Sequence, residues 1–168
     1  MAKSNSGKII ALIGGLLAVF AVLIGLLPSE ISWWYVKETL TNQASYLNAF
    51  GFFTDAGGQI EFVDDYLLLV GGLVFLAGSV LIMYGASKKE KTIAILSGVL
   101  MIIGLIVFCV ALNANENWEG VETFLSWLNT QSSVFYGEWF IWRWGLGIGF
   151  YLAAAGAVIG IIGAFVMD

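Results

Sequence analysis

The chain has 168 residues, of which 60% are hydrophobic and only 11% are charged, and its mean hydropathy is +0.90. A soluble domain is about half apolar and about a quarter charged, so this chain has too few charges to cover a surface that faces water. Its 7 basic residues, set against 12 acidic ones, form no contiguous patch of the kind that binds nucleic acid. The composition predicts an integral membrane protein with membrane lipids among its partners and no nucleic acid.

Two residue types that carry much of protein chemistry are missing or nearly so. The chain contains no histidine, the usual haem ligand, the commonest metal ligand and the commonest acid–base group near neutral pH. Its one cysteine, Cys109, lies in a long apolar run and cannot build a multi-cysteine zinc or iron–sulfur site. We therefore expect no metal, no cofactor and no enzymatic activity.

Four uncharged stretches are long enough to cross a bilayer about 30 Å thick as helices, which takes about 20 residues. They cover residues 9–27, 66–85, 92–112 and 144–167. Between them lie a loop at 28–65, a short turn at 86–91 and a second loop at 113–143. The predicted fold is an all-α membrane protein, a single membrane domain over residues 1–168 built as a four-transmembrane-helix bundle.

The basic residues predict the orientation of this bundle. Lys3 and Lys8 precede the first span, and the turn at 86–91 holds three more lysines, so five of the seven basic residues share one side. By the positive-inside rule, both termini and this turn face the cytoplasm, and we take the membrane to be the plasma membrane. Ten of the twelve acidic residues fall on the opposite side, which makes the extracytoplasmic face strongly acidic.

The first extracytoplasmic loop, residues 28–65, shows apolar residues at intervals of three or four positions. This spacing predicts an amphipathic helix of about five turns, carrying Trp33, Val36, Leu40, Ala44, Leu47 and Phe50. After it, residues 50–54 and 59–63 flank the turn-forming sequence Asp-Ala-Gly-Gly at 55–58. A small β-hairpin is possible there.

The second loop, residues 113–143, predicts another amphipathic helix. Asn117 is placed to cap it, and an apolar face runs from Trp118 to Leu128 before the helix ends near residue 129. An aromatic run then re-enters the membrane, and within it Arg143 has Glu138 nearby in sequence. We expect that arginine to form a structural ion pair or to stack on a neighbouring ring. The two helices together would form a lid over one end of the bundle.

The tryptophans are distributed on one side only. Interfacial belts normally place tryptophan at both membrane surfaces, whereas here every tryptophan lies in an extracytoplasmic loop or at its junction with a span. We predict an aromatic cap that contacts a partner, made of Trp33, Trp34, Trp118, Trp127, Trp139, Trp142 and Trp144 together with Arg143.

Small residues recur along the spans at helical spacing. Such stripes let helices approach closely in lipid, where no hydrophobic force drives helices together. The predicted packing positions are Gly145, Gly149, Ala153, Gly156, Gly160 and Gly163 in the fourth span, and Gly71, Gly78 and Gly85 in the second. Two interpretations remain open: packing within one bundle, or lateral self-association of the fourth span in a homo-oligomer.

Several loop acids are candidate cation contacts, because carboxylates are the hard oxygen ligands that calcium prefers. Their spacing matches no twelve-residue calcium loop, so solvated surface charge is the alternative interpretation. The residues concerned are Asp55, Glu61, Asp64, Asp65, Glu116 and Glu119.

The order of cytoplasmic termini, larger first loop, small inner turn and second outer loop resembles that of claudin-like tetraspans. The resemblance is one of topology. Trp33 and Trp34 stand in the first loop, but the G-L-W motif and the paired loop cysteines of those families are missing, as is the C-C-G motif of tetraspanins.

We expect a non-catalytic structural, assembly or accessory subunit, acting in a homo-oligomer or in a larger membrane complex through its aromatic, acidic outer face and glycine-rich helix faces. One alternative is an oligomeric cation channel with an acidic outer vestibule, although the spans hold no Asp, Glu, Lys or Arg. The third is an accessory protein that binds a lipid or a quinone beneath the lid.

Overall fold

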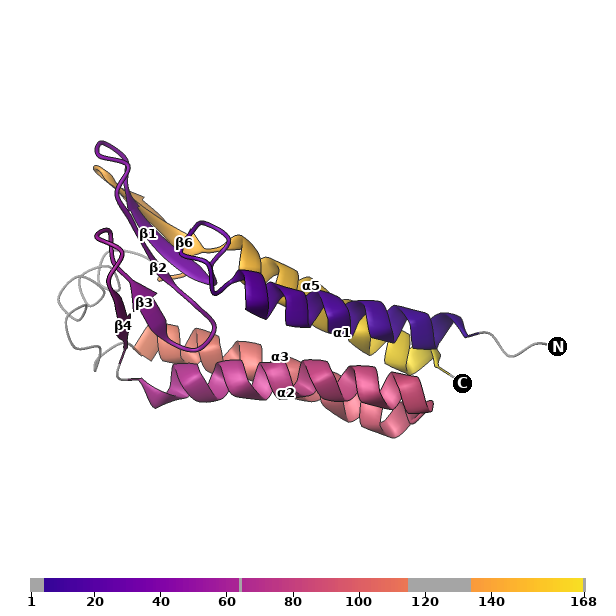
Figure 1. Cartoon of the computed structure of the whole chain (residues 1–168). Helices are drawn as coiled ribbons and strands as arrows, with labels where there is room; N and C mark the ends of the chain where they lie inside the picture. The colour runs from indigo at the N-terminus through magenta and orange to yellow at the C-terminus, as the bar shows by residue number, and fades with distance from the viewer. Residues whose placement is uncertain (1–4, 64, 115–133, 168) are drawn as a thin grey trace.

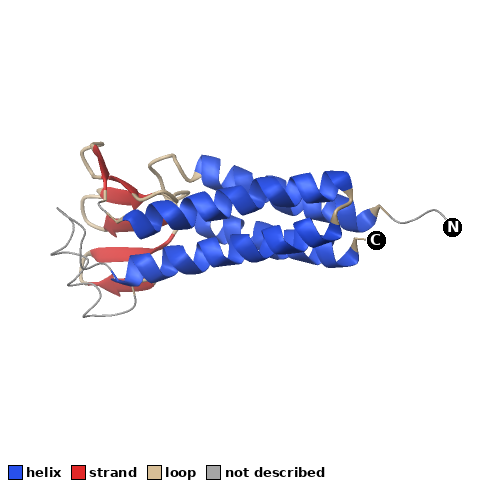
Figure 2. Ribbon diagram, turned by 90° about the horizontal axis from the view of Figure 1, so that it is seen from below, coloured by secondary structure: helices blue, strands red, loops and turns tan. Residues whose placement is uncertain are grey.

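The computed structural model describes residues 5–63, 65–114 and 134–167. Four long helices lie side by side, and a sheet closes one end of them (Figures 1 and 2). The helices are α1 (Ser6–Ile24), α2 (Tyr66–Lys88), α3 (Lys91–Ala114) and α5 (Ile148–Val166). All four are long and apolar enough to cross a membrane. The chain is therefore a mostly helical, multi-pass membrane protein.

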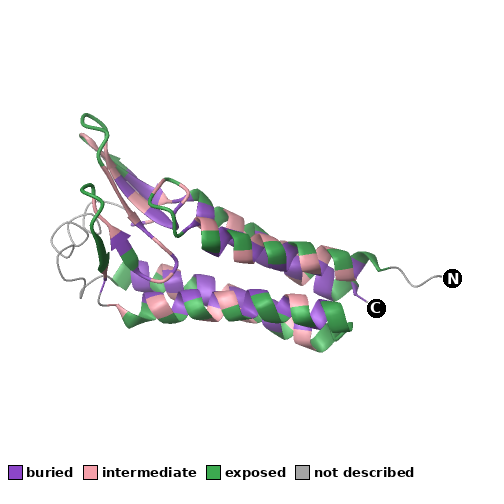
Figure 3. Ribbon diagram, in the orientation of Figure 1, coloured by how far each residue is buried: buried purple, intermediate pink, exposed green. Residues whose placement is uncertain are grey.

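Side chains in this bundle are sorted by size in the way that lipid favours. The buried positions of α1 and α5 are almost all glycine or alanine, whereas Leu16, Phe20 and Phe165 are each more than half exposed. Figure 3 shows the alternation of buried and exposed stripes along each helix. Small residues allow close helix contact, and large apolar residues face outward, as expected for helices surrounded by hydrocarbon tails.

The helices associate as two pairs. α1 packs mainly on α5, and α2 packs mainly on α3, as Figure 1 also shows. The start of α1, the end of α5 and the turn between α2 and α3 lie at the same end of the bundle, where Lys8 Nζ donates to the carbonyl oxygen of Ser87 at 3.4 Å. We call this the lysine end, and the opposite end the sheet end.

The sheet is antiparallel throughout and has the strand order β4-β3-β2-β1-β6-β5. The segment between α1 and α2 supplies β1 (Trp34–Glu38), β2 (Ala44–Leu47), β3 (Phe52–Thr54) and β4 (Ile60–Phe62). The segment before α5 supplies β5 (Tyr136–Trp139) and β6 (Trp142–Leu146). Because β1 pairs with β6, a single sheet joins the two loops.

The sheet corrects the all-α prediction. The expected helix over residues 33–50 is wrong: β1 and β2 form a hairpin there, and Asn42, with φ of 61°, lies in the connection between them. Buried Trp34 and Val36 alternate with Tyr35 and Lys37, which is strand periodicity. The possible hairpin further along is confirmed, since β3 pairs with β4 around the turn at 55–58.

The predicted spans agree with the helices to within four residues. At the lysine end, α1 begins at Ser6 rather than at residue 9, and α2 ends at Lys88 rather than at residue 85. At the sheet end, α1 and α5 both differ from the prediction. α1 ends at Ile24 rather than at residue 27, and α5 begins only at Ile148. Residues 144–146, predicted as the start of the fourth span, belong to β6 instead. Backbone pairing with β1 takes this aromatic run out of the helix. The helix predicted near residues 117–129 lies outside the described residues.

Candidate functional site

Trp33, at the base of β1, contacts all four helices. Its ring packs edge-on against Phe75 of α2 at 5.4 Å, Phe108 of α3 at 5.0 Å and Phe150 of α5 at 5.8 Å, measured between ring centroids. Its indole Nε1 donates to the carbonyl oxygen of Ala21 in α1 at 3.4 Å. The side chain is fully buried. Trp33 therefore joins the sheet to the bundle and is not available to a partner, contrary to the sequence-based prediction.

Two further tryptophans of the predicted aromatic cap are also interior. Trp34 and Trp144 are fully buried, and Trp34 Nε1 donates to the carbonyl oxygen of Val134 at 2.9 Å. Trp142 is half-buried. Trp118, Trp127 and the side chain of Trp139 lie outside what the structure describes. The cap prediction is thus wrong for Trp33, Trp34 and Trp144, because the loops fold inward onto the bundle and use these rings as core.

The small residues of α5 contact other parts of the same chain. A Cβ added to Gly156 would lie 2.7 Å from Ala18 N of α1, and one added to Gly163 would collide with the backbone of Ala11. Gly160 lies against Gly14 and Ile82, Gly149 against residues 31–33, and Ala153 is fully buried. These contacts support the interpretation of the stripe as packing within one bundle.

Glycines of α2 have the same role against α3. A Cβ on Gly78 would lie 2.8 Å from Ser97 O, one on Gly85 would lie 2.7 Å from Ala94 N, and one on Gly71 would lie 3.0 Å from Phe108 N. Gly145 differs from the rest of the predicted set, because it lies in β6 and pairs with Tyr35. Its proposed place in a helical G-x-x-x-G motif is wrong.

Two of the candidate cation ligands hold backbone turns together. Asp55 Oδ1 accepts the N–H groups of Gly57 at 2.9 Å and Gln59 at 2.8 Å. Asp65 caps α2 by accepting the N–H of Leu67 at 2.8 Å. Glu61 is exposed on β4, while Asp64, Glu116 and Glu119 lie outside the described residues. Within the described part of the chain, no three acids are close enough together to hold a metal ion.

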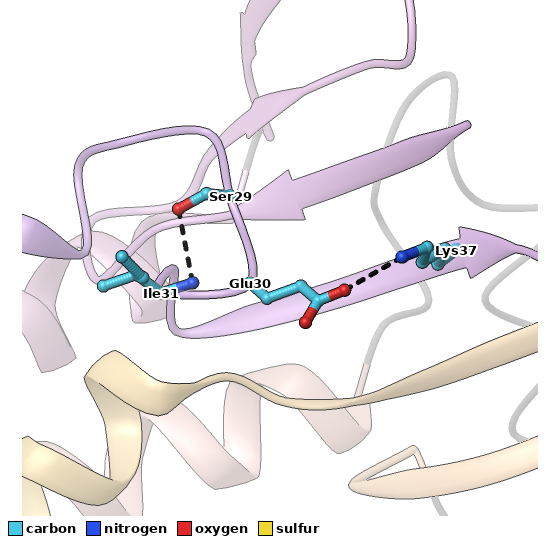
Figure 4. Close-up of polar contacts among 4 residues, drawn as sticks. All are labelled: Ser29, Glu30, Ile31 and Lys37. Carbon is cyan, nitrogen blue, oxygen red and sulfur yellow. Dashed lines mark hydrogen bonds and ion pairs between the residues drawn. The ribbon is translucent and has the colours of Figure 1, made fainter. Parts of the chain in front are cut away.

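Ion pairs lie on the exposed face of the central strands. Arg143 of β6 pairs with Glu138 of β5 at 3.3 Å, which confirms the predicted structural ion pair. Lys37 of β1 pairs with Glu30 at 3.0 Å, as Figure 4 shows. Arg143 and Lys37 are direct cross-strand neighbours. Their acidic partners offset the repulsion that two like charges in this position would cause.

A tyrosine belongs to this same face. Partial burial raises the pKa of Tyr35, and the negative charge of Glu30 raises it further, whereas Arg143 lowers it. A Cβ on Gly145 would lie 3.5 Å from Tyr136 Cδ2 and 3.8 Å from Tyr35 Oη. The two tyrosines therefore flank that glycine on neighbouring strands.

The tips of two hairpins are joined and present apolar side chains. Thr39 donates to the carbonyl oxygen of Ile141 twice, from its N at 2.7 Å and from its Oγ1 at 3.0 Å. Leu40 and Phe140, in the two joined turns, are 76% and 86% exposed. Phe140 has φ of 53°, a left-handed conformation that is uncommon for a bulky residue. Sequence reasoning missed this pair because it assigned Leu40 to the buried face of a helix.

An apolar pocket of about 500 Å³ lies beside the last turns of α3 at the sheet end. α3 contributes most of the lining, half-buried Phe135, just before β5, contributes the rest, and the pocket is largely open. The lining residues are Leu105, Ile106, Cys109, Val110, Asn113, Ala114 and Phe135.

Known families and curated proteins supply no function for this chain. No protein-family model matches its sequence, and a search of curated proteins finds no similar chain.

Proposed function

We propose that the chain is a non-catalytic subunit of a membrane assembly, and that its sheet is a rigid platform that holds a partner membrane protein. The observation that carries this proposal is the joined pair of hairpin tips. Leu40 and Phe140 are large apolar side chains, 76% and 86% exposed, in two turns that are joined by hydrogen bonds from Thr39 to Ile141. Apolar and aromatic anchors of this kind commonly dominate the energy of protein interfaces.

Rigidity of the platform supports the same proposal. Strands from both loops form one sheet, and Trp33 fixes the base of that sheet to all four helices. An anchor held in place before binding loses little conformational entropy when a partner docks. In Figure 1 the joined hairpins lean away from α2 and α3, over the side of the bundle that α1 and α5 form. A neighbour in the same membrane beside α1 and α5 is within reach of them.

The proposal includes the orientation of the helix bundle and the membrane in which it lies. The lysine end contains Lys8, Lys88, Lys89 and Lys91, and the positive-inside rule assigns it to the cytoplasm. We place both termini there and the sheet outside, in the plasma membrane. The topological resemblance to claudin-like tetraspans accords with this arrangement but adds no function to it.

The test is native mass spectrometry of the protein extracted gently from its own membrane. The double variant Leu40→Ser with Phe140→Ser is expected to lose the peaks of the assembly, whereas the wild type keeps them. Ile60→Ser is the matched control, because Ile60 is 68% exposed on the same sheet but lies in edge strand β4. Assembly peaks that survive the double variant would refute the proposal. The masses also distinguish a homo-oligomer from a complex with another protein.

A second candidate function, an accessory protein that binds a lipid or a quinone, is favoured by the pocket beside α3. Its volume of about 500 Å³ and its apolar lining suit an acyl or isoprenoid chain. A small molecule that stays bound in the native mass spectrum, and is lost in Ala114→Trp, would favour it. The channel alternative, a pore between several copies with an acidic outer vestibule, gains no comparable support: Asp65 caps α2, and Asp64, Glu116 and Glu119 lie outside the described residues.

A further inference from the structure

The two helix pairs differ in length. α1 and α5 have 19 residues each, whereas α2 has 23 and α3 has 24. At 1.5 Å per residue, these lengths are about 28 Å for the shorter pair and about 35 Å for the longer one. At the lysine end the shorter pair does not fall short of the longer one, since Lys8 near the start of α1 reaches the carbonyl oxygen of Ser87 near the end of α2. The difference therefore falls at the sheet end, where α2 and α3 reach further than α1 and α5 (Figure 1).

The position of Trp33 gives the depth at which the sheet begins. Its partner Phe75 lies nine residues after Tyr66, the first residue of α2, which corresponds to about 14 Å along the helix axis. Its partner Phe108 lies six residues before Ala114, the last residue of α3, or about 9 Å. β1 therefore starts beside apolar turns of α2 and α3. On the side of α1 and α5, the base of the sheet therefore lies at the same depth as the sheet-end turns of α2 and α3.

One face of the sheet continues the outward side of α5. β1 lies beside the start of α5, because Trp34 pairs with Leu146 and Gly147 N donates to the carbonyl oxygen of Trp33 at 2.9 Å. Tyr151, in the first turn of α5, is 59% exposed. On the same face, Tyr136 of β5 is 65% exposed. Lys37 lies two residues beyond Tyr35 along β1, a distance of about 7 Å. A membrane interface favours tyrosine at the boundary of the hydrocarbon and lysine or arginine further out, which is the order of these side chains.

We propose that the face of β1, β6 and β5 that carries Tyr35, Tyr136 and Arg143 lies against the lipid headgroups of the leaflet beside α1 and α5. Tyrosine rings then reach the boundary of the hydrocarbon layer. Above them, the ion pairs Lys37–Glu30 and Arg143–Glu138 lie at the level of the phosphates. Water in the headgroup layer satisfies the backbone groups of the sheet edge, which hydrocarbon would not.

Nitroxide labels on single cysteines test this placement. The cross-strand row through Tyr35 joins Tyr136 at one edge of the sheet to Ile60 at the other, by way of Gly145, Tyr46 and Thr54. Tyr136 and Ile60 are a matched pair, 65% and 68% exposed. In a Cys109→Ala background, Tyr136→Cys and Ile60→Cys are labelled and reconstituted into phosphatidylcholine–phosphatidylglycerol vesicles. Tyr151→Cys serves as the lipid-facing reference.

Relaxation of the labels by oxygen, which concentrates in the bilayer, is compared with relaxation by a water-soluble nickel chelate. For the label at Tyr136, as for the label at Tyr151, we expect oxygen to cause more relaxation than the nickel chelate does. For the label at Ile60 we expect the nickel chelate to cause more relaxation than oxygen does. A larger nickel effect at both edges of the sheet would overturn the proposal. Protection of Tyr136 from both reagents that disappears on dilution into excess lipid would also overturn it, because a second copy would then cover this face. If Tyr136→Cys loses its helical circular dichroism, Glu138→Cys on the same face replaces it. At the level of the phosphates, its nickel effect should still be smaller than that at Ile60, and an equal effect at the two positions would overturn the proposal.

Discussion

Replacing Trp33 by alanine should release the sheet from the bundle. Trp→Ala at a buried position costs about 3–5 kcal/mol, and Trp33 is fully buried. Edge-to-face ring contacts each contribute about 0.5–1.5 kcal/mol beyond the burial of area, and Trp33 makes three of them. The two ranges overlap at about 3–4 kcal/mol, and we expect Trp33→Ala to lower the free energy of unfolding by this amount. The loss should be this large even in lipid, because the ring packs against protein on every side.

The assay is unfolding in mixed micelles by increasing the fraction of a denaturing detergent, followed by circular dichroism. Trp142→Ala is the matched control, because Trp142 is a half-buried tryptophan in the same sheet; we expect its loss to be less than half as large. Trp33→Phe, which keeps a ring but removes the Nε1 donor to Ala21, should fall between the two. Equal losses for Trp33→Ala and Trp142→Ala would refute the reasoning that Trp33 joins the sheet to the helices.

Two other predictions concern helix contact and pH. Gly156→Leu should lower the free energy of unfolding in the same assay by at least about 2 kcal/mol, because its Cβ would lie 2.7 Å from Ala18 N; Ala155→Leu, one residue away on the exposed side of α5, should be tolerated. An equal loss for both variants would contradict the close packing of α1 on α5. Folding raises the pKa of Tyr35 above its ordinary value of 10.0, so its contribution to stability is complete below pH 10 and is lost as the pH rises through the folded-state pKa. Tyr35→Phe should remove part of the alkaline loss of stability, and an unchanged alkaline limb in a detergent-unfolding series would argue against it.

The helices could be predicted from the sequence, but of the sheet only the β3–β4 hairpin could. Crossing a membrane requires a long apolar run, so composition alone sets the helix positions to within a few residues. Strand β1 gave an ambiguous signal. Trp33, Val36 and Leu40 match a helical repeat, while Trp34 and Val36 also match the two-residue repeat of a strand. What decides between them is pairing with β6, far along the chain, which no local pattern reports.

The candidate site was misplaced for a related reason. Tryptophan in a loop next to a span is commonly an interface residue, and that rule led to Trp33, Trp34 and Trp144 as partner contacts. The loops instead fold down onto the bundle and bury all three. The two most exposed apolar residues beside the sheet, Leu40 and Phe140, lie in turns, where an apolar side chain gives no periodic signal.

Contacts within each helix pair differ from contacts between the two pairs, and the sheet strengthens the contacts between the pairs. Within each pair, backbones touch through glycine and alanine, which gives close packing along the whole helix. Between the pairs, the contacts at the sheet end are aromatic rings centred on Trp33. The sheet adds a second link there, because β1 and β6 adjoin α1 and α5 whereas β4 leads into α2. Pairing of β2 with β3 connects these two halves, so weakening that pairing should loosen one helix pair against the other without separating the helices within either pair.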